Sequence, residues 1–161
     1  MLALIQRING GRVVVEGKTV ARCEGHGLLV LLGVTHTDTE KDAELLADKI
    51  AKLRVFSDEN DKMNLSVTDV DGGIIVVSQF TLYASYRKGN RPDYMNSAHP
   101  SVAEPLYEYF TEYIKKYTDK VSHGVFGAHM EVSIMNDGPV TIQLDSDVLK
   151  GPKRNNNDIE N

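Results

Sequence analysis

Cysteine, long apolar runs and excess positive charge are all scarce in this chain of 161 residues. Because its single cysteine, Cys23, cannot form an internal disulfide, the sequence favours a reducing, cytoplasmic location. No apolar run approaches the roughly 20 residues that span a bilayer, and the N-terminal segment lacks the basic start and apolar stretch of a signal peptide. We therefore expect a protein with no membrane partner.

The formal net charge of −5 argues against a protein that coats nucleic acid through a broad basic face. It does not exclude a protein that touches only the tip of an RNA. The main compositional objection to any RNA-directed function is this acidic balance.

Motifs for metal, phosphate and serine chemistry are also missing. Five histidines, at positions 26, 36, 99, 123 and 129, show no pair at metal-ligand helical spacing, and Cys23 has no neighbour to complete a zinc site. Gly11–Thr19 resembles a P-loop, but its first glycine lies one residue too far away and an alternating strand replaces the loop. No Gly-x-Ser-x-Gly elbow presents a serine. We expect neither a metal nor a cofactor.

Alternating and helical patterns fill the rest of the chain. Strands are predicted at Leu2–Ile8, which ends at Gly10-Gly11, in a hairpin around Glu16-Gly17, and at Leu28–Gly33, which suits burial on both faces. Thr37–Glu40 has the spacing of a capping box before a helix. That helix and a second one are marked by apolar residues at helical spacing, namely Ala43, Leu46, Ala47, Ile50 and Leu53, and then Val102, Leu106, Tyr109, Phe110, Tyr113 and Tyr117.

Later strands are predicted at 74–82, 130–134 and 140–144, with a turn at Asn136-Asp137-Gly138. The sum is one strand-rich α/β or α+β domain over residues 1–146 with two main helices. From Asp147 onward the chain is polar, and we expect residues 147–161 to form a disordered tail.

Two segments carry the functional interpretation. Ser78-Gln79-Phe80-Thr81-Leu82 places polar and aromatic groups at the end of an apolar strand, which also fits a strand that simply emerges into solvent. Asn136-Asp137-Gly138-Pro139-Val140-Thr141 fits an ordinary hairpin turn equally well. Pro139, however, removes a backbone donor and is a place where a cis bond can occur.

Together, in this order and at this separation, the two segments resemble those of the D-aminoacyl-tRNA deacylases. The resemblance extends to Ile5-Gln6-Arg7, Leu31–Val34, Lys88–Asp93 and Phe126-Gly127 with Met130, and it covers the chain to about Ser146. Asp137 departs from it, standing where many relatives carry serine. The resemblance implies a mostly antiparallel, barrel-like sheet and a homodimer with its active site at the subunit interface. It also implies an enzyme that removes D-amino acids from tRNA and acts on glycyl-tRNA as well.

In that family the bond matching Gly138-Pro139 is cis and reaches into the active site of the other subunit. A rigid backbone wall near the substrate α-carbon would exclude an L side chain and admit a D one, but it could not exclude glycine. The resemblance also suggests that Phe126 and Met130 pack the terminal adenosine. Their alternation fits an ordinary core strand equally well.

Hydrolysis of the aminoacyl ester needs an attacking water and donors for the developing oxyanion. In a regular strand, Ser78 and Phe80 cannot share a face with Gln79 and Thr81, so the backbone N–H groups of Phe80 and Thr81 are the attractive donors. A Thr81 nucleophile would need a base, and none is evident nearby in sequence. The resemblance implies instead that the ribose 2′-hydroxyl of the substrate helps to activate water.

Arg87, Lys88 and Arg91 could meet phosphates of the aminoacyl-tRNA acceptor end, or they could form an ordinary exposed basic turn. The tyrosines of the second helix are expected to serve packing rather than base stacking. Two rival functions remain open. One is a non-catalytic nucleic-acid-associated factor on the same fold that uses Lys150–Arg154, and the other is a general small-ester hydrolase that uses Thr81.

Overall fold

A long antiparallel hairpin forms the centre of the computed structural model, which describes residues 1–151. β1 (Leu2–Val15) turns at Glu16-Gly17 into β2 (Lys18–Gly33), as the sequence predicted. The predicted end of the first strand at Gly10-Gly11 is wrong, because β1 continues through both glycines. Its register against β2 shifts there, so the glycines accommodate an irregularity within the strand rather than ending it.

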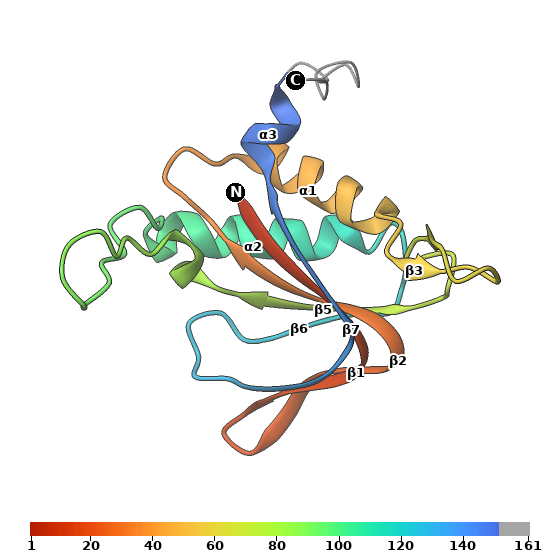
Figure 1. The fold of residues 1–161 in the computed structure, drawn as a ribbon. Helices are drawn as coiled ribbons and strands as arrows, with labels where there is room; N and C mark the ends of the chain where they lie inside the picture. The colour runs from red at the N-terminus through yellow and green to blue at the C-terminus, as the bar shows by residue number, and fades with distance from the viewer. Residues whose placement is uncertain (152–161) are drawn as a thin grey trace.

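Three further strands complete the main sheet, whose order is β6-β5-β2-β1-β7. β5 (Gly73–Ser78) runs parallel to the second half of β2, and β6 (Val121–His123) runs parallel to β5. β7 (Glu131–Asp145) pairs antiparallel with β1. The longer pairings are therefore antiparallel and the shorter ones parallel. The sheet curls strongly in Figure 1 but stays open, because β6 and β7 lie at its two edges.

Two helices cover one face of this sheet (Figure 1). α1 (Glu40–Lys52) buries Ala43, Leu46, Ala47 and Ile50, as its periodicity predicted. Its capping box begins at Thr39 rather than Thr37, since the Asp42 carboxylate accepts from the Thr39 N–H at 3.0 Å. A small separate hairpin, β3 (Phe56–Ser57) with β4 (Met63–Leu65), follows α1.

The buried side of α2 (Pro100–Ile114) is rotated about the helix axis relative to the side that the sequence predicted. Tyr107 and Phe110 are buried, whereas Val102 is exposed and Tyr109 stacks on Tyr113 at the margin of the core. Pro100 occupies the first turn, where a missing N–H costs no intrahelical bond. The predicted packing role of the later tyrosines therefore applies to a flank of the helix, and Tyr107 is the one that reaches the sheet.

The curl of the sheet creates two apolar cores. The larger lies between the sheet and the helices, and a smaller one gathers Ile8, Val13, Ala21, Cys23, Leu29, Ile75 and Val77. This mixed single domain confirms the predicted fold class. None of the helices in residues 1–151 is long and apolar enough to cross a membrane.

A third, short helix, α3 (Ser146–Lys150), corrects the expectation of disorder from Asp147 onward. Two contacts with Asp42 of α1 hold this helix in place. The buried Ser146 hydroxyl donates to Asp42 Oδ1 at 2.6 Å, and Lys150 Nζ lies 2.5 Å from the same oxygen. The remainder of the predicted tail, residues 152–161, lies outside the described residues.

Candidate active site

The end of β5 opens into a cavity because the strand stops at Ser78. The Gln79 N–H still donates to Leu32 O of β2 at 2.8 Å, but the chain then turns into a 3₁₀ helix, Phe80–Tyr83. The strict alternation expected for this segment therefore ends at Ser78. As a result three consecutive residues, Ser78, Gln79 and Phe80, line the same cavity, whereas Thr81 does not.

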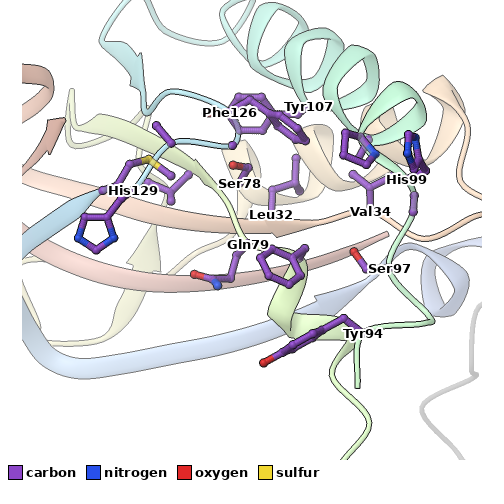
Figure 2. A pocket seen from close by; sticks show the side chains of 18 of the residues that line it. Leu32, Val34, Ser78, Gln79, Tyr94, Ser97, His99, Tyr107, Phe126 and His129 are labelled. Atoms are coloured by element: carbon purple, nitrogen blue, oxygen red, sulfur yellow. The ribbon is translucent and has the colours of Figure 1, made fainter. Parts of the chain in front are cut away.

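The cavity has a volume of about 640 Å³, within the usual range for small-molecule sites. Its walls come from the ends of β2 and β5, the segment that leads into α2, α2 itself, and the loop between β6 and β7. In the view of Figure 2, His99 and His129 lie toward opposite ends, with Ser78 and Leu32 between them. The lining is mainly apolar; its members are Leu32, Val34, Val77, Ser78, Gln79, Phe80, Tyr94, Ser97, Ala98, His99, Pro100, Ala103, Tyr107, Phe126, Gly127, Ala128, His129, Met130 and Val132.

The loop between β6 and β7 brings Phe126 and Met130 to the cavity together. They were expected to alternate within a strand, but β6 ends at His123 and β7 begins at Glu131, so both belong to the connecting loop. Tyr107 supports this loop from α2. Its hydroxyl donates to Val76 O (3.1 Å) and Gly124 O (3.3 Å), and its ring lies 5.8 Å from that of Phe126.

Hydrogen-bond donors remain free where β5 turns. Within residues 1–151, no protein acceptor lies within hydrogen-bond reach of the backbone N–H groups of Phe80 and Thr81, the first two residues of the 3₁₀ helix. The Gln79 side-chain amide donates to the Thr81 hydroxyl. No carboxylate or imidazole of the described chain hydrogen-bonds to Thr81, so the structure gives this hydroxyl no general base.

The basic residues Arg87, Lys88 and Arg91 do not line the cavity. They are exposed on a loop whose two ends are held together by Ser85 and Asp93, each of which donates its N–H to the other's carbonyl. The loop leaves the body of the protein between the 3₁₀ helix and α2 (Figure 1). The loop therefore adjoins the side of the cavity that Phe80 and Tyr94 form.

Gly138 and Pro139 lie within β7, which corrects the predicted hairpin turn. Asn136 pairs with Ile8 and Thr141 with Gln6, so one continuous strand bulges between these pairs. The Gly138-Pro139 bond is cis, and both residues are exposed. Neither lines the cavity of its own chain.

Arg7 holds this bulge, a role that the sequence alone did not assign. Its Nε donates to Asp137 O at 3.0 Å and lies 3.2 Å from the Asp137 carboxylate, while Nη1 donates to Val55 O at 2.6 Å. A side chain at Gly138 would meet Val140 N at 3.0 Å and Arg7 Nη2 at 3.1 Å. The bulge therefore requires a residue without a Cβ at this point.

Sequence reasoning also missed much of the cavity wall, because Tyr94, His99, Tyr107 and His129 stand in no motif. The His99 side chain accepts from the Ser101 N–H and so caps the start of α2. As for metals, residues 1–151 contain no group of three or more His, Cys, Asp or Glu side chains that could hold an ion.

Comparison with known proteins identifies the class of this site. The family model described as D-Tyr-tRNA(Tyr) deacylase matches residues 4–145. A D-aminoacyl-tRNA deacylase of Thermosipho africanus is 56% identical over 146 residues, covering 91% of this chain and 97% of the relative. One of Dictyoglomus turgidum is 50% identical over 154 residues, covering 96% and 98%.

Two solved structures share the fold. The c-Myc DNA Unwinding Element Binding Protein is 42% identical, with a TM-score of 0.84 and coverage of 90% of this chain and 98% of that one. A probable eukaryotic D-amino acid tRNA deacylase gives a TM-score of 0.76 over 89% and 98%, but at 17% identity it supports the fold alone.

The chain belongs to the D-aminoacyl-tRNA deacylase family. It is thus a hydrolase whose substrate is an aminoacyl-tRNA, and the resemblance and enzyme class predicted from the sequence are confirmed.

Proposed function

We propose that the cavity beside Ser78 holds the terminal adenosine and aminoacyl ester of D-aminoacyl-tRNA, with Ser78, Gln79, Phe80 and Thr81 as the catalytic segment. The observation that carries this proposal is the turn after Ser78, which leaves two adjacent backbone N–H groups without an acceptor in residues 1–151, beside an apolar cavity. Phe126 and Met130, both on the cavity wall, are suited to pack the adenine.

In this arrangement the N–H groups of Phe80 and Thr81 stabilise the oxyanion that forms when water attacks the ester carbonyl. The 2′-hydroxyl of the terminal ribose assists the attacking water. The tetrahedral intermediate then collapses, releasing the free D-amino acid and the 3′-hydroxyl of tRNA. Thr81 has no base and serves to position Gln79 through their hydrogen bond. We expect Thr81→Ala to retain measurable turnover, and complete loss of turnover with intact substrate binding would support a covalent Thr81 instead.

Chiral selection in this proposal comes from Gly138 and Pro139 of a second copy of the chain. They are exposed and lie outside the cavity of their own chain, so they can act on the substrate only in a partner's cavity. Their backbone forms a wall that an L side chain strikes, whereas a D side chain points away from it. Glycine has nothing to strike the wall, so glycyl-tRNA is also a substrate. The active form is thus a homodimer with the site at its interface.

The cations Arg87, Lys88 and Arg91 contact backbone phosphates of the acceptor end. Only this single-stranded end needs to approach the protein, which is compatible with the net charge of −5. We place the enzyme in the cytoplasm, in keeping with its single cysteine.

The decisive measurement compares hydrolysis of D-tyrosyl-tRNA and L-tyrosyl-tRNA by the purified protein in the presence of a chelator. We expect rapid loss of the D ester alone. The matched comparison for the wall uses glycyl-tRNA and L-alanyl-tRNA, where the glycyl ester should be cleaved and the alanyl ester should persist. Equal rates on these two esters would refute a steric wall, whatever the result with tyrosine.

The same assays test the two rival functions. A general ester hydrolase would cleave an activated ester that lacks tRNA. A non-catalytic factor would bind a nucleic-acid duplex and leave both tyrosyl esters intact. Its proposed contact begins at Lys150, whose ammonium already lies 2.5 Å from Asp42 and 3.0 Å from Asp147; residues 153 and 154 lie outside the described chain. Lys150, the first cation of that contact, is therefore already paired with two carboxylates.

A further inference from the structure

Two tyrosines outside the catalytic segment lie beside the cavity. Tyr94 lines the cavity wall, and its ring packs edge-to-face on that of Phe80 with the centroids 5.0 Å apart. Tyr86 belongs to the adjoining loop and is 80% exposed, while Tyr94 and Phe80 are 40% and 55% exposed. Rings of this size gain little from exposure to water, so an uncovered group beside a binding cavity indicates a contact surface.

Backbone pairing places the two tyrosines on the same side of the loop. Ser85 and Asp93 form a hydrogen-bonded antiparallel pair, with N···O distances of 2.8 and 2.9 Å. Side chains alternate between the two faces along each paired segment, so Tyr86, which follows Ser85, and Tyr94, which follows Asp93, lie on the face opposite to those two residues. On that face they are diagonal neighbours, which typically lie about 7–8 Å apart. The pairing therefore sets Tyr86 on the same face as Tyr94, whose ring packs on that of Phe80 at the cavity.

The loop beyond these rings is positively charged. Between Tyr86 and Asp93 it carries Arg87, Lys88 and Arg91 and no acidic residue, although the chain as a whole has a net charge of −5. Exposed rings interleaved with cations are typical of sites that bind single-stranded nucleic acid, because bases stack on the rings while phosphates meet the cations. The substrate class supplies such a strand, since the acceptor end of tRNA is unpaired.

We infer that Tyr86 and Tyr94 form a stacking platform for the unpaired nucleotides that precede the terminal adenosine of the substrate. This inference rests on the proposed placement of that adenosine in the cavity, and it extends the site outward by one or two nucleotides. Stacking is tolerant of sequence because every base has an aromatic face. The platform thus adds affinity for the acceptor end without restricting the enzyme to one tRNA.

The test compares two substrates in the wild type and in Tyr86→Ala. One is D-tyrosyl-tRNA, and the other is D-tyrosyl-adenosine, which lacks every nucleotide that the platform would hold. We expect Tyr86→Ala to lower kcat/KM for the tRNA substrate by on the order of tenfold and to leave hydrolysis of D-tyrosyl-adenosine unchanged. Tyr86→Phe should retain the wild-type rate on both substrates, because the ring remains.

Met95→Ala is the matched control, since Met95 is also 80% exposed in the same region but has no ring. This variant should behave as the wild type does. A direct readout uses a non-hydrolysable D-aminoacyl-amide analogue of the acceptor end with 2-aminopurine two positions before the terminal adenosine, where the outer ring, Tyr86, would meet it. Stacking should quench its fluorescence on binding to the wild type and to Tyr86→Phe, but not on binding to Tyr86→Ala.

Three outcomes would overturn the platform. They are an unchanged rate of Tyr86→Ala on D-tyrosyl-tRNA, an equal loss on both substrates, and quenching that survives in Tyr86→Ala. Failure of the proposed function gives a different result, because the wild type itself would then leave D-tyrosyl-tRNA intact. The two failures are therefore separable in one set of reactions.

Discussion

Replacing Arg7 by methionine removes the side chain that fixes the bulge of β7 while keeping an unbranched apolar stem. The Arg7 side chain is only 11% exposed, and it joins three parts of the chain: β1, the Val55 carbonyl after α1, and Asp137 beside the bulge. If Gly138 and Pro139 form the chiral wall, this substitution loosens the wall without touching the catalytic segment. It therefore separates selectivity from turnover.

The expected loss of unfolding free energy follows from the two hydrogen bonds that the Arg7 guanidinium donates to carbonyl groups. Each hydrogen bond of a charged group contributes about 1.5–3 kcal/mol, and partial exposure and relaxation place the pair near the lower end, at about 3 kcal/mol in total. For a domain of this size that corresponds to a fall in Tm of roughly 6–12 °C. If about 1.4 kcal/mol of this loss acts on the wall, discrimination between L and D esters falls about tenfold.

The assay measures hydrolysis of D- and L-tyrosyl-tRNA by Arg7→Met at a temperature where circular dichroism shows the variant folded. We expect the D rate to change little and the L rate to rise. Arg12→Met is the control, since Arg12 is an exposed arginine on the same strand, and Arg7→Lys should be intermediate because it keeps the charge but not the guanidinium geometry. A folded Arg7→Met enzyme with wild-type selectivity would refute the reasoning.

Three further predictions follow from contacts away from the wall. Tyr107→Phe removes a hydroxyl that supports the loop before β7, so urea unfolding should show a fall of about 1 kcal/mol in the unfolding free energy. The KM for aminoacyl-tRNA should rise more than kcat falls. An unchanged KM would argue against loop support. Burial alone would raise the pKa of Asp42, but hydrogen bonds from Lys150 and Ser146 lower it below the ordinary range. The stabilisation that the ionised Asp42 gives the folded state is therefore present above about pH 4 and lost as the pH falls further. Asp42→Asn should thus flatten the decline of the unfolding free energy in acid. A parallel decline in both proteins would contradict this. Burial raises the pKa of the Cys23 thiol, so iodoacetamide should label the native protein slowly and the unfolded protein fast, whereas rapid native labelling would contradict its burial.

The elements that the sequence predicted well are those whose signals are local. Helix α1 follows from apolar residues at helical spacing and from threonine and aspartate near its start. The β1–β2 hairpin follows from two alternating segments around Glu16-Gly17. In these segments the buried face, the turn and the partner strand lie close together in sequence, so little information from the rest of the fold is needed.

The turn after Ser78 could not be predicted in the same way, because its cause lies elsewhere in the chain. Gln79 and Phe80 carry no glycine or proline signal, so the predicted strand ran on through them to residue 82. The turn packs against Gly33 of β2, where an added Cβ would lie 3.1 Å from Gln79 O and 3.2 Å from Leu82 Cβ. A close approach between β2 and the 3₁₀ helix thus decides which side chains reach the cavity.

The error at Gly138 has a related origin. Asn136–Pro139 does leave the regular strand, as its turn residues indicate. A hairpin, however, requires the chain to reverse and to pair with itself, and here both flanks pair with β1. The local signal for a departure from the strand was correct, and the long-range pairing converted it into a bulge held by Arg7.

Under the proposed function, the distribution of charge would let an acidic protein act on RNA. The cations Arg87, Lys88 and Arg91 are concentrated on one loop next to the cavity, while the chain as a whole carries an excess of five negative charges. A long duplex lying across the surface would meet this negative field, whereas a flexible single strand entering at the loop would meet the cations first. The same distribution that disfavours the duplex-binding rival therefore favours an enzyme that admits only the unpaired end of its substrate.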